Sequence, residues 1–281
     1  MAVIYFLVVG SSAAFFDLDK TVIAKSSALA FGRPFYRDGL ITRREAMKAG
    51  YAHLAFKING ADDTSIAKIR DYLAELSKGW SAEQVRQIVD ETLHELIKPY
   101  VYAEAAALIA EHQANGRDVV LVSASGEEFV RPIGAQLDVS DVIATRMKIV
   151  DGVYTGEMDF YAAGPGKVAA VKELAAERGY DLADCYAYSD SISDAPLLEI
   201  VGNPTAVNPD RALRKMATER SWPILEFRRP VPLGARMRKQ LKERPVVPVA
   251  AAAAVGVAIG IAWYGHHRRR SKAASNDPKS A

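Results

Sequence analysis

The sequence contains very little cysteine and almost no net charge. Cys185 is the one cysteine among 281 residues, so the chain cannot form an intramolecular disulfide, which fits a reducing compartment. The 36 basic and 34 acidic residues nearly cancel, and the net charge of +2 provides no field that would attract nucleic acid. We therefore predict no nucleic-acid partner, and the function has to be sought in local motifs.

The chain also lacks the marks of a secretory signal. Residues 1–10 contain no basic residue and only a short apolar run, and a strand-like segment that ends in two acids follows soon after. We predict that residues 3–9 form an extra strand or an irregular tail, and we do not expect secretion.

Strand patterns are scarce between residues 22 and 114, where apolar residues recur with helical spacing. Ser81 is predicted to cap a helix, with Gln84 three residues later completing a capping box. Another helix is predicted over residues 103–115, before Gly116. This region is therefore expected to be helical.

Short apolar segments that end in polar residues flank this helical region. Residues 13–16, 117–128 and 185–189 are predicted to be strands, and a helix is predicted to begin just after Pro165 and Gly166. Alternating strands and helices predict a parallel sheet with right-handed crossovers. Ligands of such sheets bind at the carboxyl ends of the strands.

Two further regions are predicted to be extended. Asp151-Gly152 favours a type I′ turn between two short strands. Residues 205–210 and 222–227 are predicted to contain short strands and turns.

A run of 20 uncharged residues, 246–265, lies near the C-terminus. Its length suits a helix that crosses a bilayer core of roughly 30 Å, and Trp263 and Tyr264 stand where interfacial aromatics occur. We predict a single transmembrane helix there, between a basic linker at 228–245 and a basic polar tail at 266–281. The large N-terminal part is then expected in the cytoplasm, anchored to the membrane. An Ala-rich helix that packs on the domain is the alternative.

The same segment carries small residues at four-residue spacing, Ala252, Gly256 and Gly260, a pattern that pairs transmembrane helices. Since Ala-rich segments also produce this pattern by chance, a homodimer through this face is an open alternative.

Polar residues that suit catalysis stand at the ends of the predicted strands and at one helix start. Taken singly, each has an ordinary structural explanation, because paired aspartates cap turns or helices and a helix lysine is usually solvated. Together they stand where the elements of one parallel sheet would bring them to one edge. The set comprises Asp17, Asp19, Thr21, Ser123, Lys167, Asp190 and Asp194.

With these residues in this order, the sequence resembles the haloacid-dehalogenase-like (HAD) superfamily, and within it the phosphoserine-phosphatase-like branch of subfamily IB. The resemblance covers roughly residues 13–227 and rests on D-x-D-x-T, VVLVS, the lysine of PGKVAAVKEL and the D-x-x-x-D of SDSISD. It implies a Rossmann-like α/β core with a parallel sheet over residues 11–22 and 115–227. It also implies a helical C1-type cap over residues 23–114, inserted after the first strand.

The resemblance further implies a mechanism of phosphoryl transfer. Asp17 is the expected nucleophile that forms an aspartyl-phosphate, and Asp19 is the expected general acid and base, on the same side of an extended chain. Mg²⁺ is the expected cofactor, with the Asp17 carboxylate, the Asp19 carbonyl and Asp190 as ligands. The residues expected to bind the phosphate are Thr21, Ser123, Ala124 and Lys167. Thr21 is also expected to brace its loop through a side-chain hydrogen bond. Asp194 is expected to orient Lys167 or a metal-bound water.

Several positions depart from the pattern of this branch. Lys20 and Ser26 stand where phosphoserine phosphatases have a serine and a substrate-binding glutamate, and Ala124 replaces a glycine. The acids that carry the chemistry are present, whereas positions that recognise phosphoserine differ. We therefore predict a phosphomonoester hydrolase for a small phosphorylated metabolite or a lipid phosphate, with Lys20 and Lys25 suited to an anionic ligand.

Two other functions stay open at this point. A threonine in place of Asp19 would indicate a pump-type ATPase, so the aspartate favours a hydrolase or a transferase to an acceptor other than water. The alternative from another class is a membrane-tethered regulatory module that binds a phosphorylated ligand or a division or envelope protein. The complete set of acids argues against a pure binding module.

Overall fold

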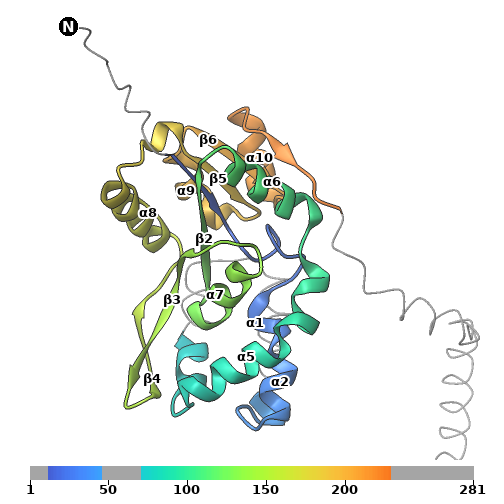
Figure 1. The fold of residues 1–281 in the computed structure, drawn as a ribbon, viewed down its shortest axis with the longest axis vertical. Coiled ribbons are helices and arrows are strands. Elements are labelled where there is room, and N and C mark those ends of the chain that lie inside the picture. The colour runs from blue at the N-terminus through green and yellow to red at the C-terminus, as the bar shows by residue number, and fades with distance from the viewer. Residues whose placement is uncertain (1–11, 46–70, 229–281) are drawn as a thin grey trace, which may run out of the picture. The chain divides into compact units, whose positions relative to one another are not determined.

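The structure is a computed structural model that describes residues 12–45 and 71–228 (Figure 1). A seven-stranded sheet runs through this region in the order β4-β3-β2-β1-β5-β6-β7. All neighbouring strands are parallel except β3 and β4, which are antiparallel. The strands are β1 Ala13–Phe16, β2 Asp118–Gly126, β3 Asp141–Val150, β4 Val153–Phe160, β5 Tyr186–Ser189, β6 Asn203–Val207 and β7 Ile224–Leu225. The predicted α/β fold with a parallel sheet is confirmed.

Side chains of β1 alternate between two hydrophobic cores, one on each face of the sheet. Phe16 belongs to one core, which includes residues of α6 and α7. Phe15 belongs to the other, which includes residues of α8, α9 and α10. These helices are α6 Ala103–Ala114, α7 Glu127–Ala135, α8 Pro165–Arg178, α9 Ala195–Glu199 and α10 Arg211–Glu219. Because β1 is fully buried and lies between β2 and β5, the residue that follows it leaves the sheet at the centre of its carboxyl edge.

The remaining helices lie beyond the carboxyl edge of β1 and beside α7 (Figure 1). Within the described residues these helices are α1 Ser27–Ala30, α2 Gly32–Arg37 and α5 Ala82–Leu96. Short 3₁₀ helices occur elsewhere, at η1 Lys98–Tyr100, η2 Leu182–Asp184 and η3 Ile192–Asp194. The side chain of Ser81 accepts a hydrogen bond from the N–H of Gln84 at 3.3 Å, so the predicted N-cap of α5 is confirmed.

The hairpin of β3 and β4 attaches α5 to the sheet. The N–H of Ala82 donates to the carbonyl of Gly152 at 2.9 Å, directly at the hairpin turn. Asp151 and Gly152 both have positive φ, 51° and 78°, which agrees with the predicted turn type. The flanking strands are longer than predicted, because β3 pairs with β2 as well as with β4.

Helix α6 packs on the sheet. Ile109 belongs to the core below Phe16, and the His112 ring contacts the rings of Phe16 and Tyr188. The predicted domain boundaries, including the cap over residues 23–114, stay predictions.

Within residues 12–45 and 71–228, no helix has the length and hydropathy needed to span a bilayer. The predicted N-terminal segment, the predicted span with its small-residue face, the tail and nearly all of the linker lie outside the described residues.

His112 is a buried core residue that is held in one tautomer. Its Nε2 lies 2.8 Å from the hydroxyl of Tyr188, and its Nδ1 accepts a hydrogen bond from Nε of Arg117 at 2.7 Å. Burial, and then the nearby Arg117 charge, lower the pKa of His112 to about 4. The folded protein therefore holds this imidazole neutral.

We expect His112 to make stability depend on pH. Below about pH 6.5 the unfolded chain binds a proton here that the folded chain does not, so stability falls as pH decreases toward 4, by up to roughly 3 kcal/mol. His112→Gln should lose this part of the dependence. Denaturant unfolding of both proteins at pH 7 and pH 4.5 measures the difference, and equal losses in both would contradict a buried neutral histidine.

Candidate active site

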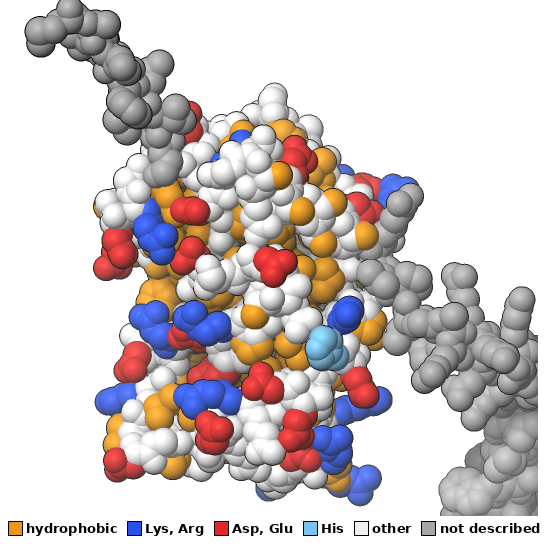
Figure 2. Space-filling model, in the orientation of Figure 1, with side chains coloured by type: hydrophobic (Ala, Val, Ile, Leu, Met, Phe, Trp, Pro, Cys, Tyr) orange, Lys and Arg blue, Asp and Glu red, His pale blue; other side chains and the backbone are white. Residues whose placement is uncertain are grey.

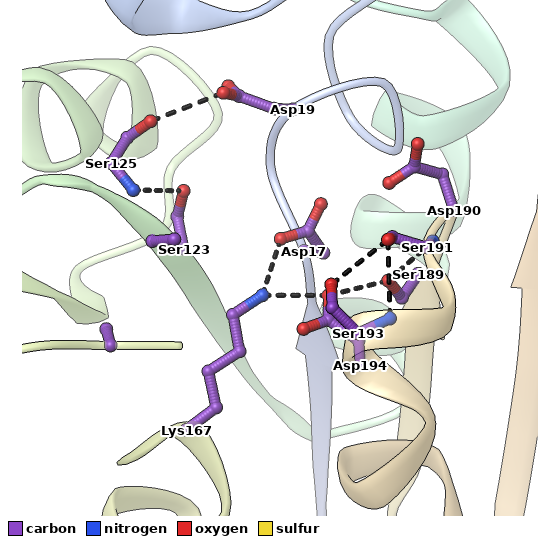
Figure 3. Close-up of polar contacts among 12 residues, drawn as sticks. Asp17, Asp19, Ser123, Ser125, Lys167, Ser189, Asp190, Ser191, Ser193 and Asp194 are labelled. Carbon is purple, nitrogen blue, oxygen red and sulfur yellow. Dashed lines mark hydrogen bonds and ion pairs between the residues drawn. The ribbon is translucent and has the colours of Figure 1, made fainter. Parts of the chain in front are cut away.

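The first aspartate of the D-x-D motif follows β1 directly and stays within the sheet. The N–H of Asp17 donates to the carbonyl of Tyr188 in β5 at 2.9 Å. Its side chain is buried at the carboxyl edge, where residues from β1, β2 and β5 converge (Figure 3). The central strand thus fixes the backbone of the predicted nucleophile before the chain leaves the sheet.

Lys167 of α8 lies between two acids that are distant in sequence (Figure 3). Its Nζ is 2.7 Å from Oδ1 of Asp17 and 2.8 Å from Oδ2 of Asp194, and the side chain is 3% exposed. Burial alone would lower the pKa of Lys167, but the two aspartates outweigh it and raise this pKa, so the ammonium stays charged. Burial raises the pKa of Asp17; Lys167 opposes this, and Asp194 and Asp190 raise it further.

The start of α8 places this lysine by a close backbone approach. A Cβ on Gly166 would lie 2.2 Å from the carbonyl oxygen of Tyr161, so only glycine fits there. The helix begins at Pro165, which suits the first turn of a helix because its missing N–H is not needed. Lys167 is therefore set in the first turn, against the sheet edge.

The end of β5 contributes a second group of acids. The hydroxyl of Ser189 donates to Oδ2 of Asp194 at 2.7 Å, which fixes the carboxylate that binds Lys167. Burial raises the pKa of Asp190 to about 6, against the effect of Lys20, whose Nζ lies 3.6 Å from Oδ2 of Asp190. Lys20 has a positive φ of 62°, and 65% of its side chain is exposed.

Asp19 points toward the end of β2 and not toward Asp17 (Figure 3). Its Oδ1 accepts a hydrogen bond from the N–H of Ser27 at 2.9 Å, and its Oδ2 accepts one from the hydroxyl of Ser125 at 3.3 Å. Burial raises the pKa of Asp19, against the hydrogen bonds that it accepts from Ser27, Ser26 and Ser125. The expectation that the two carboxylates share one side is therefore wrong.

The reason lies in the loop that follows. The N–H groups of Val22 and Ile23 donate to the carbonyl of Leu18 at 2.9 and 3.0 Å, so the chain turns where an extended strand was expected.

Thr21 does not brace this loop. Its Oγ1 is buried and has no hydrogen-bond partner among the described residues, and the predicted side-chain bond is wrong.

Ser123 and Ala124 lie at the end of β2, where its register with β3 shifts. The buried hydroxyl of Ser123 accepts a hydrogen bond from the N–H of Ser125 at 3.2 Å. The carbonyl of Ala124 accepts from the hydroxyl of Thr145 at 2.8 Å. The predicted contacts of these two residues with phosphate stay predictions.

The sequence did not single out three serines that hold the acids: Ser27, Ser125 and Ser189. Each stands beside a motif residue or at an element boundary, where serine usually indicates only a turn or a cap. The long-range contact between Ser125 and Asp19 carries no sequence signal of its own.

The donor set fits a magnesium ion. Carboxylates outnumber ammonium groups at this edge, and burial raises the pKa of both Asp17 and Asp190. Across the described ranges, no cluster of three His, Cys, Asp or Glu side chains is placed to hold a metal. The predicted magnesium ligands do not require such a cluster of three side chains, because two carboxylates, the Asp19 carbonyl and waters are a usual environment for Mg²⁺.

A parallel α/β sheet with paired aspartates after its central strand, a buried lysine and further acids at the same edge defines a HAD-like hydrolase. The model of the haloacid dehalogenase-like hydrolase family matches residues 14–199, and the chain belongs to this family.

Relatives of this chain include named phosphatases. A Streptomyces azureus protein named inhibition of morphological differentiation protein is 54% identical over 265 residues, covering 93% of this chain and 96% of its own. A probable phosphatase of Mycobacterium tuberculosis is 53% identical over 250 residues, with 89% and 84% covered. A phosphoserine phosphatase of the same organism is 34% identical over 220 residues, with 78% and 71% covered.

The fold also matches a solved structure. A Bordetella pertussis protein of unknown function aligns with a TM-score of 0.68 at 28% identity, covering 76% of this chain and 98% of its own. Together with the family match, these relatives identify the chain as an enzyme of the phosphatase type.

Lys167→Met tests the role of the buried ammonium in the fold. The change leaves Asp17 and Asp194 without the cation between them, so we expect a loss of about 3–5 kcal/mol in the free energy of unfolding. Lys172→Met, at an exposed position of the same helix, should change it by less than ~0.5 kcal/mol. Chemical denaturation measures both, and equal effects would contradict the buried ion cluster.

Proposed function

We propose that this chain is a Mg²⁺-dependent phosphomonoester hydrolase that works through an aspartyl-phosphate. The observation that carries the proposal is the convergence of Asp17, Asp19, Lys167 and Asp190 at one edge of the sheet. The family match and a relative named a probable phosphatase support the same reaction.

The first step forms a bond between Asp17 and phosphorus. Lys167 holds Oδ1 of Asp17, so Oδ2 is the oxygen that attacks. As the new bond forms, the ester bond from phosphorus to the leaving oxygen breaks, and Asp19 gives its proton to that oxygen. Lys167 and the Ser123 hydroxyl stabilise charge on the equatorial phosphate oxygens.

The second step hydrolyses the intermediate. Asp19, now a carboxylate, takes a proton from water, whose oxygen attacks phosphorus while the bond to Asp17 breaks. Inorganic phosphate leaves, and both aspartates return to their starting state. Asp17, Asp190 and the Asp19 carbonyl would hold Mg²⁺, which offsets the negative charge where the phosphate and the carboxylates meet.

Asp17→Asn should abolish hydrolysis of p-nitrophenyl phosphate in the presence of Mg²⁺, because the amide is a poor nucleophile. We expect kcat to fall by at least about 10³-fold with the circular dichroism spectrum unchanged. Asp151→Asn makes the same chemical change at an exposed hairpin turn and should leave kcat within about twofold. Wild-type inactivity across a broad phosphoester panel, or full activity of Asp17→Asn, would refute the proposed function.

The proposed substrate is a small phosphorylated metabolite or a lipid phosphate that carries a further negative charge. Lys20 supports this choice, because its exposed ammonium lies beside Asp190. Lys25 is engaged elsewhere, with Nζ 3.2 Å from the centre of the Tyr100 ring. The relative named phosphoserine phosphatase brings phosphoserine into consideration, but Ser26 replaces the glutamate expected to bind its amino group.

Lys20→Ser should weaken binding of phosphoesters that carry a carboxylate. We expect KM for 2-phosphoglycolate to rise about two- to fivefold relative to KM for β-glycerophosphate, because an exposed ion pair contributes less than ~1 kcal/mol. Lys25→Ser serves as the matched control, with no change in this ratio. A ratio unchanged by Lys20→Ser would remove this lysine from substrate recognition.

A second candidate function is a regulatory module tethered to the membrane. The Streptomyces azureus relative favours it, since the name of that protein describes a cellular effect and no reaction. For both candidate functions we propose that residues 246–265 anchor the protein in the membrane and that the catalytic part lies in the cytoplasm. Membrane fractionation of the protein with and without residues 246–281 tests this anchoring. A cellular phenotype restored equally by wild type and Asp17→Asn would favour the regulatory function.

A further inference from the structure

The predicted acid and base residue, Asp19, accepts hydrogen bonds from Ser125 (Figure 3) and from Ser27, and these two serines are bonded to each other. Its Oδ2 accepts from the hydroxyl of Ser125, and the hydroxyl of Ser27 in turn donates to Ser125 at 2.8 Å. The N–H of Ser27 donates to Oδ1 of Asp19 at 2.9 Å. Both carboxylate oxygens therefore have donors, and the two donor residues are bonded to each other.

The pair joins two segments that are far apart in the chain. Ser125 lies near the end of β2, directly before Gly126 and α7, and Ser27 is the first residue of α1. Ser27 is completely buried, so its position is fixed by packing as well as by hydrogen bonds. Asp19 is thus oriented by one rigid element of the sheet and one helix start.

The orientation suits in-line displacement. In such a reaction the nucleophile and the leaving oxygen lie on opposite sides of phosphorus. The acid that protonates the leaving oxygen must therefore lie beyond the phosphate as seen from Asp17, and the Asp19 carboxylate points away from Asp17 toward Ser125 (Figure 3). Without the hydroxyl of Ser125, Oδ2 would lose the contact that holds it on that side.

We propose that Ser125, supported by Ser27, is a positioning residue that holds Asp19 where it protonates the leaving group. This inference rests on the proposed hydrolase activity. It assigns no new bond-making step, because the proton still passes from Asp19 to the leaving oxygen. Ser125 sets the geometry of that transfer, and misplacement by about an ångström reduces such rates strongly.

Ser125→Ala should therefore affect substrates according to their leaving groups. An alkyl phosphate such as β-glycerophosphate needs the proton, so its kcat/KM should fall by about 10- to 100-fold, within the range that general acids contribute. p-Nitrophenyl phosphate releases a stable phenolate that needs no proton, so its kcat/KM should fall less than about threefold. Using kcat/KM isolates the first step, before the hydrolysis of the intermediate that both substrates share.

Further variants separate positioning from a general loss of structure. Asp19→Asn should show the same dependence on the leaving group more strongly, and Ser27→Ala should show it more weakly, since the backbone donor to Oδ1 remains. Ser189→Ala removes a hydroxyl that binds Asp194 and not Asp19, so it should affect both substrates equally.

Equal losses on both substrates in Ser125→Ala and in Ser27→Ala would overturn the inference while leaving the hydrolase proposal intact. Failure of the wild type to hydrolyse any ester of a broad phosphoester panel would instead refute the proposed function, so the two failures are distinguishable.

Discussion

The ammonium of Lys167, enclosed between Asp17 and Asp194, is the interaction on which the site depends. Buried charges cost several kcal/mol each unless they are paired, so the fold must bring the end of β1, the start of α8 and η3 to one point. The close backbone approach at Gly166 and the hydrogen bond from Ser189 serve this convergence. Its chemical consequence is that one oxygen of Asp17 is occupied while the other faces the edge of the sheet.

The same cluster leaves the edge with an excess of negative charge. Asp190 illustrates the consequence, because burial raises its pKa to about 6 and Lys20 counteracts that effect only from an exposed position. A phosphate dianion would add charge of the same sign. An oxygen-ligated divalent cation would relieve both problems at once, which supports the proposed dependence on Mg²⁺ over binding of a phosphate by lysines alone.

Patterns local in sequence predicted most of the fold, and the errors arose both from local features that such patterns misjudge and from a contact that is distant in sequence. Asp151-Gly152 specified its turn through backbone preference alone. Helix α7 was not predicted, because Pro132 in its interior is normally a sign against a helix. The loop at Thr21 was expected to be braced by a side chain, whereas backbone hydrogen bonds to Leu18 hold it. Ser125 reaches Asp19 across more than a hundred residues, which no spacing rule reveals.

The residues proposed for the chemistry and the residue proposed for substrate recognition differ in how deeply they are buried. Asp17, Lys167 and Asp194 are buried and mutually bonded, so a change in one leaves an unpaired charge in the interior. Lys20 is mostly exposed, and an exposed ion pair contributes less than ~1 kcal/mol. Residues that select a substrate can therefore change at little cost to folding, while residues that carry the chemistry cannot. For this reason the motifs of this chain indicate an enzyme of the phosphatase type, whereas they do not specify the alcohol that leaves.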